Sequence, residues 1–95
     1  MHISKSVWDY YHQQDLDGYL SASFTQAQLD QRNDKGMTLL MVAALNGEVA
    51  WVKACKFKGA DLDLVNDKGQ KAVILAANAG HDKVIIHLIE SGAGG

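Results

Sequence analysis

The tetrapeptide NDKG occurs twice in the chain, at residues 33–36 and 66–69, so its two copies lie 33 residues apart. Over the thirty residues that begin at each copy, residues 33–62 and 66–95, nine positions are identical. Average amino-acid usage would give roughly two identities by chance. The identical residues fall at a turn, at a pair of alanines and at two further glycines, where the backbone restricts residue type. We therefore interpret the chain as built from a repeated unit of 33 residues.

The unit at residues 33–65 predicts two helices. Thr38 is a candidate N-cap for a helix through Leu40–Ala44, and Asn46-Gly47 ends it. A second helix is expected over Val49–Lys58, where Gly59 stops it. An extended stretch at residues 60–65 then leads into the next NDKG turn.

The unit at residues 66–95 predicts the same order of elements. It gives one helix near Ala72–Ala79, a turn at Gly80, a second helix near Asp82–Ser91 and a stop at Gly92. Upstream, Ala27, Leu29 and Asp30 match residues 60, 62 and 63 at the same offset, which indicates a degenerate earlier unit. A unit of this size cannot bury its own apolar face, so the units must stack.

This pattern resembles the ankyrin repeats, which have a 33-residue period of one turn and two helices. The residues that carry the resemblance are Asp34–Leu40, Ala43–Gly47, Gly59–Leu62, Ala76–His81 and Gly92-Ala93. The resemblance implies an all-α, ankyrin-type solenoid of about three helix-turn-helix repeats, with about six helices and short extended hairpin turns. It implies one domain over residues 1–95, divided into a degenerate N-terminal capping repeat at 1–32, a full repeat at 33–65 and a C-terminal repeat at 66–95.

The chain departs from the family pattern at specific positions. The family's Thr-Pro-Leu-His signature appears as Thr38–Met41, and in the last unit as Lys71–Ile74, where the capping threonine is lost. A missing N-cap costs about 1 kcal/mol of stability. Lys56 stands where the family usually has a buried leucine. Either the helix rotates locally, or the Lys56 side chain extends along the surface to reach solvent.

The composition limits the classes of function. The net charge is −2, with 47% hydrophobic and 21% charged residues, which argues against disorder and gives no electrostatic reason for nucleic-acid or membrane binding. The longest apolar run is far below a membrane span, and the first residues show no secretion signal. A single cysteine, Cys55, excludes an internal disulfide and fits a reducing, cytoplasmic location.

No residue pattern predicts catalysis, a cofactor or a metal. His2, His12, His81 and His87 lack metal-ligand spacing, and His81 follows Gly80 as the family's structural histidine does. Asp61–Val65 begins like a calcium loop but has valine at a ligand position, so we interpret its aspartates as bonded to local backbone amides. Asp15 is interpreted as a helix cap, and Cys55 as a buried, inert thiol beside Trp51. We expect a protein that is not an enzyme.

The family uses its concave surface, made of turn tips and first-helix faces, to hold protein partners. The resemblance places the contact positions at Arg32, Asp34, Lys35, Met37, Leu45, Asn46, Val65, Asp67, Lys68, Gln70, Asn78 and Ala79. The partner's identity stays open. It is held by a scaffold or blocked by an inhibitor or immunity-type protein, and the alternative surface is the convex side around Lys53 and Phe57.

Two further expectations concern exposed surfaces. Lys35 and Lys68 project from adjacent turn tips beside apolar residues, which favours an acidic partner segment with one or two apolar anchors. The last helix is apolar nearly all round, through Val84, Ile86 and Ile89. The chain is therefore either a piece of a longer array or self-associates through its C-terminal repeat.

Overall fold

The computed structural model describes residues 5–90 and forms seven helices over that range. Their order is α1 (Val7–His12), α2 (Leu16–Ser21), α3 (Gln26–Leu29), α4 (Leu39–Asn46), α5 (Val49–Lys58), α6 (Ala72–Ala79) and α7 (Asp82–Glu90). The prediction of an all-helical solenoid is confirmed, and the number of helices is one higher than expected. The predicted Ser91 end of the last helix and the Gly92 stop lie outside the described residues.

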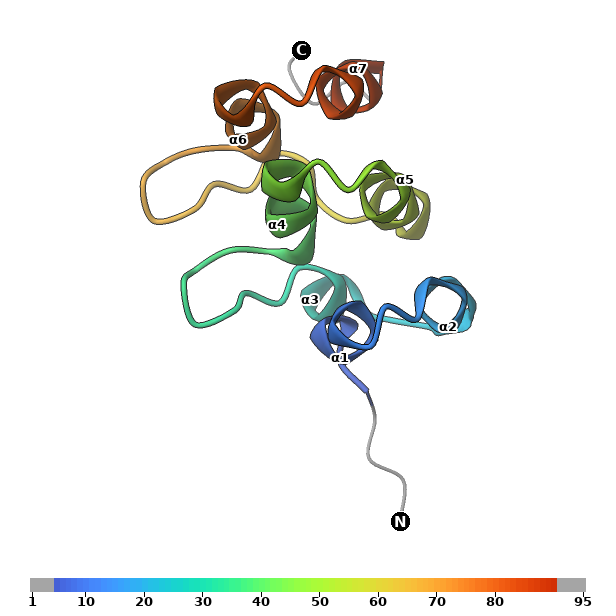
Figure 1. Ribbon diagram of the computed structural model, residues 1–95. Helices are drawn as coiled ribbons and strands as arrows, with labels where there is room; N and C mark the ends of the chain where they lie inside the picture. Colours follow the sequence, from blue (N-terminus) through green and yellow to red (C-terminus); the bar gives the residue numbers. More distant parts are fainter. Residues whose placement is uncertain (1–4, 91–95) are drawn as a thin grey trace.

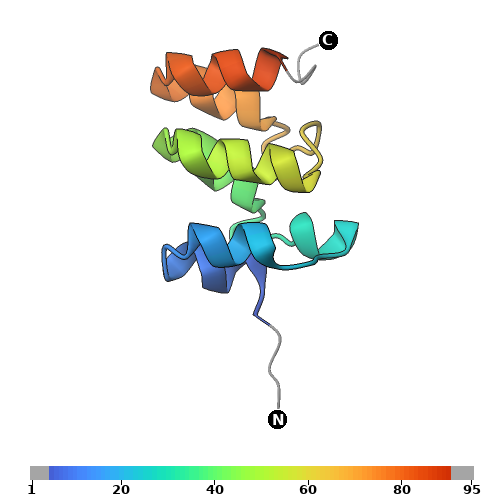
Figure 2. The same cartoon turned by 90° about the vertical axis from the view of Figure 1, so that its right-hand side faces the viewer.

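The helices form two columns in a stack of three layers (Figures 1 and 2). In the inner column, α4 packs between α1 and α6, and in the outer column α5 packs between α2 and α7. Within each layer the inner helix packs on its outer neighbour, as α4 does on α5. The long turns before α4 and α6 both project to the same side of the stack (Figure 1).

Local signals fix where the helices begin and end. The Thr38 side chain accepts a hydrogen bond from the backbone N–H of Met41, as its assignment as an N-cap predicts. Lys71 stands at the same position before α6 and makes no side-chain cap bond, so the predicted loss of a cap is confirmed. Gly47, Gly59 and Gly80 follow α4, α5 and α6 with positive φ, which glycine adopts without a steric penalty.

The two NDKG turns are held by their asparagines. The Asn33 Oδ1 accepts from the backbone N–H groups of Lys35 and Met37, at 2.9 and 3.0 Å. Asn66 repeats the arrangement with Lys68 and Gln70. The prediction assigned turn bonds to the neighbouring aspartates as well, but the side-chain bonds that hold both turns come from asparagine. The second turn is closed by an antiparallel bridge between Val65 and Lys71.

The helix that the sequence analysis missed is α3. It replaces the last turn of an outer helix in the first layer, because α2 ends at Ser21, whereas α5 continues to Lys58. Thr25 caps α3 through the N–H of Gln28, and the Gln28 side chain bonds back to the N–H of Thr25. This capping box is readable in the sequence, but the repeat register drew attention away from it.

The core runs continuously between the two columns. Its middle section includes Leu40, Ala43, Ala44, Val52 and Leu88, each at most 2% exposed. Small side chains on α4 and α6 let the two inner helices approach closely. Between the first two layers, aromatic side chains fill the gap: the Trp51 ring lies 5.3 Å from that of Tyr11 and 5.4 Å from that of Tyr19.

Lys56 reaches a polar end instead of displacing its helix. Its Nζ donates to the backbone carbonyl oxygen of His87 at 2.6 Å, and its neighbour Cys55 stays buried. Of the two alternatives for Lys56, the extended side chain is therefore the one observed. The bond ties α5 to α7.

Candidate partner-binding surface

The predicted contact residues lie at the surface on the turn side of the stack. Ten of the twelve are exposed, whereas Met37 and Gln70 are half-buried. They come from the two long turns and from the last turns of α4 and α6. Exposure alone does not make a binding site, so we asked which of them border a concavity.

Two grooves border the inner column. The first, of about 560 Å³, lies between the first and second layers. The second, of about 420 Å³, lies between the second turn and the end of α4. Lys35, Met37 and Leu45 line both grooves and so form a shared ridge between them.

Eight of the twelve predicted residues line one groove or the other. They are Arg32, Asp34, Lys35, Met37, Leu45, Asp67, Lys68 and Gln70. Asn46 lies outside the grooves and contacts Tyr11, whose hydroxyl donates to Glu48. Val65, Asn78 and Ala79 are exposed but border neither groove.

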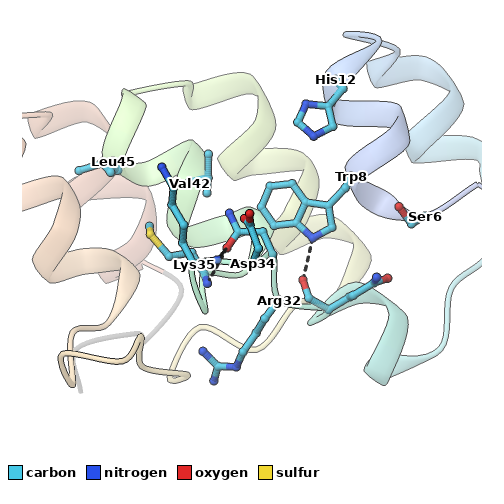
Figure 3. Close-up of a pocket in the computed structure, with 11 residues that line it drawn as sticks. Ser6, Trp8, His12, Arg32, Asp34, Lys35, Val42 and Leu45 are labelled. Atoms are coloured by element: carbon cyan, nitrogen blue, oxygen red, sulfur yellow. Dashed lines mark hydrogen bonds between the residues drawn. The ribbon is translucent and has the colours of Figure 1, made fainter.

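The first groove also contains residues that the sequence analysis did not predict. Figure 3 shows Trp8 and His12, from α1, facing Val42 and Leu45 on α4. The Nε1–H of Trp8 donates to the carbonyl oxygen of Gln31 at 2.9 Å, which fixes the indole against the first turn. Tryptophan is among the residues that dominate interface energetics. Its position in a degenerate repeat, where the 33-residue register gives no alignment, is why it was missed.

Arg32 was predicted to anchor a partner, but in this structure it joins two turns of the chain itself. Its Nη1 donates to the carbonyl oxygens of Gly36 and Val65, both at 2.7 Å. The guanidinium is therefore a brace between successive turns, and less of its hydrogen-bonding capacity remains for a partner. Asp67 reinforces the same junction, since its carboxylate packs directly over Gly36.

Lys35 and Lys68 present their charges freely. Both side chains are exposed, and within residues 5–90 neither ammonium makes an ion pair. They lie one repeat apart on adjacent turn tips, with Leu45, itself 40% exposed, lining the second groove with them. Asp34 and Asp67 lie beside them, so the edge is only mildly basic, and its specificity must come from the combination of charge and apolar ridge.

The described residues offer little chemistry. Within residues 5–90, no group of three or more His, Cys, Asp and Glu could hold a metal ion. The Asp61 carboxylate accepts from the N–H of Asp63 at 2.9 Å, as its interpretation as a local turn bond predicts. Asp15 accepts from the N–H of Gly18 at 3.0 Å and caps α2, also as predicted.

Cys55 is buried, and burial raises the pKa of its thiol to about 12. The pKa of the Tyr19 hydroxyl is also raised, first by burial and then by the neighbouring Cys55. Nucleophilic attack needs the thiolate, so Cys55 is inert at neutral pH. The prediction of a buried structural thiol is confirmed.

The stacked layers, the glycine stops and the paired asparagine turns agree with a comparison to known families. A family model described as ankyrin repeats, in three copies, matches residues 14–94. The chain belongs to the ankyrin-repeat family. Ankyrin repeats are generally protein–protein interaction modules and typically form domains without catalytic activity. Among curated proteins, none matches the chain.

The ankyrin structure also bears on membranes. Within residues 5–90 no helix is long and apolar enough to cross a bilayer. The histidine of the ankyrin pattern has its expected structural role, because the Nε2 of His81 lies 3.0 Å from the carbonyl oxygen of Leu45. That contact joins the third layer to the second.

Proposed function

We propose that this ankyrin domain binds one protein partner through the two grooves of its concave side and performs no catalysis. The observation that carries the proposal is the shared ridge of Lys35, Met37 and Leu45 between the two grooves. A partner segment that crosses the ridge occupies both grooves in one binding event. The rigidity of the turns favours such binding, because Asn33 and Asn66 already fix them before the partner arrives.

The chemistry of the grooves defines the partner. The apolar contribution comes from Trp8, Val42 and Leu45, which favour one or two apolar anchor residues. The free ammonium groups of Lys35 and Lys68 favour carboxylates on either side of those anchors. The partner segment we propose is therefore acidic and carries an apolar or aromatic residue at its centre.

A cytoplasmic location fits this proposal. The single cysteine is free and buried, which suits a reducing compartment. Fluorescence imaging of the tagged chain in its source cell checks this, and localisation outside the cytoplasm would contradict it.

The proposal is tested by parallel affinity capture with matched variants. Wild-type protein, a concave triple variant (Lys35→Glu, Leu45→Ala, Lys68→Glu) and a convex variant (Phe57→Ala) are used as bait in the same cell extract. We expect one partner to be enriched by the wild type and by the convex variant and lost from the concave variant. All of these residues are exposed, so circular dichroism should show that each variant is folded. Retention of the partner by the concave variant would overturn the assignment.

A further inference from the structure

A third concavity lies on the opposite side of the molecule from the turn tips, between the outer helices of the first two layers. It has a volume of about 520 Å³ and is lined by Leu16 and Leu20 of α2 and by Ala50, Lys53, Ala54 and Phe57 of α5. We call it the convex groove. Phe57 is 79% exposed, the highest value of any large hydrophobic side chain in residues 5–90.

The local sequence explains why this groove exists. Ala50, Lys53, Ala54 and Phe57 follow the i, i+3, i+4, i+7 spacing of one helix face, and two of the four are alanines that leave space above the backbone. The walls are held together because the Lys58 Nζ donates to the carbonyl oxygens of Leu20 and Ala22. The face from residue 50 to residue 57 spans about 10 Å, or two turns of a docked helix.

Lys53 gives the groove a charge preference. It is exposed, and within residues 5–90 its ammonium has neither an ion-pair nor a hydrogen-bond partner. No acidic residue lines the groove with it. A helix that docks here should therefore present apolar anchors beside a carboxylate.

The chain itself carries such a helix. On α7, Val84 and Leu88 are fully buried, while Ile86 and Ile89 on the opposite side are 54% and 57% exposed. Asp82, Ile86 and Glu90 follow the i, i+4, i+8 spacing, so two carboxylates flank the central isoleucine on this outer face. Lys83 lies at its edge, which leaves two acidic groups against one basic group.

We propose that the convex groove of one molecule binds the outer face of α7 of a second copy. Ile86 and Ile89 would occupy the apolar groove beside Leu16, Leu20 and Phe57, and a carboxylate of α7 would meet Lys53. The two contact surfaces differ, so the contact is heterologous, and repetition of it produces rings or open chains of molecules. The concave grooves stay free, so this assembly is independent of the proposed partner binding.

The contact is expected to be weak. A two-turn helix in a groove buries less area than a standard stable interface, so association should be visible only at high protein concentration. The geometry nevertheless makes a specific prediction that simple stickiness does not, because each molecule must supply two different surfaces.

The experiment is a complementation test by sedimentation velocity over protein concentrations up to the millimolar range. Phe57→Ser removes the groove contact, and Ile86→Ser removes the helix contact. We expect each variant alone to lose self-association, with its dimerisation constant weakened by about tenfold or more. A one-to-one mixture should recover a heterodimer, because the Phe57→Ser molecule still offers α7 and the Ile86→Ser molecule still offers the groove.

Ile74→Ser is the matched control, since Ile74 is also an exposed isoleucine, on α6, but takes no part in the proposed contact. Ile74→Ser should associate like the wild type. Three results would overturn the proposal: a wild-type protein that stays monomeric throughout, association that persists in Phe57→Ser, or a mixture that does not recover the complex. Circular dichroism of each variant separates loss of contact from loss of folding.

Discussion

The imidazole of His81 lies so close over Gly47 that a β-carbon at Gly47 would be 2.6 Å from its Nδ1. Gly47 ends α4 and His81 precedes α7, so this contact joins the second and third layers. Gly80 occupies the equivalent position one repeat later, with almost the same φ, +77° against +73°, yet an added β-carbon there would meet nothing within 4 Å. The two glycines therefore share one backbone requirement but differ in packing.

Gly47→Ala should destabilise the protein more than Gly80→Ala. Both substitutions place a β-carbon in the left-handed region, which costs about 1–2 kcal/mol. Gly47→Ala must also displace the His81 ring and its contact with the Leu45 carbonyl oxygen, for about 1 kcal/mol more. Urea unfolding of the two variants measures the difference, and equal losses of stability would show that the His81 contact contributes nothing.

Lys71→Thr should stabilise the protein by about 0.5–1 kcal/mol. The backbone at Lys71 has φ −77° and ψ 162°, nearly the values at Thr38, where the threonine side chain caps α4. A threonine at position 71 can therefore cap α6 through the N–H of Ile74. Lys71→Ala is the control for loss of the exposed ion pair with Asp63, which contributes little. If Lys71→Thr melts no higher than Lys71→Ala, a side-chain cap at this position has no effect.

The parts of the fold that depend on short-range signals could be predicted from the sequence. The Thr38 cap, the asparagine turns and the glycine stops each involve residues within four positions of one another, and the 33-residue repeat located them. The bonds from Arg32 to two turns could not be predicted, because they depend on how far successive layers are displaced. Trp8 was missed because the first repeat has lost the spacing that would have placed it on the inner face.

Stability should fall as the pH rises above about 9. Burial raises the pKa of Cys55 from 9.0 to about 12 and also raises the pKa of Tyr19, so the folded state keeps both groups protonated. This contribution is fully present below the unfolded-state pKa values and is lost as the pH rises through the folded-state values. Each group reduces the free energy of unfolding by up to about 1.4 kcal/mol per pH unit in that window.

Denaturant unfolding between pH 7 and pH 11 measures this slope. Tyr19→Phe is the control, because it removes one of the two buried titrating groups together with a hydroxyl that has no hydrogen-bond partner within residues 5–90. The variant should show a shallower decline. It should also be at least as stable as the wild type at pH 7, because an unsatisfied buried hydroxyl is costly. An unchanged slope would assign the pH dependence to other groups.

Binding kinetics should separate the charged residues from the apolar ones on the concave side. Lys35→Glu and Lys68→Glu should slow association with the captured partner, and the effect should shrink at high salt. Leu45→Ala and Trp8→Ala should instead speed dissociation, by about tenfold if either residue is an energetic anchor. Surface-based kinetic measurements at two salt concentrations give both rates. Charge reversals that change only dissociation would contradict the steering role of the lysines.

The most direct test of the account is to map the partner's footprint on the chain by amide chemical-shift perturbation with the captured partner. The account predicts that the largest changes fall on the first turn around Lys35, on the end of α4 at Val42–Leu45 and on the second turn at residues 66–70, with Trp8 Nε1–H also shifted. The convex groove should be unaffected at low protein concentration. Changes confined to Leu16–Leu20 and Ala50–Phe57 would contradict the concave assignment and place the partner on the convex side.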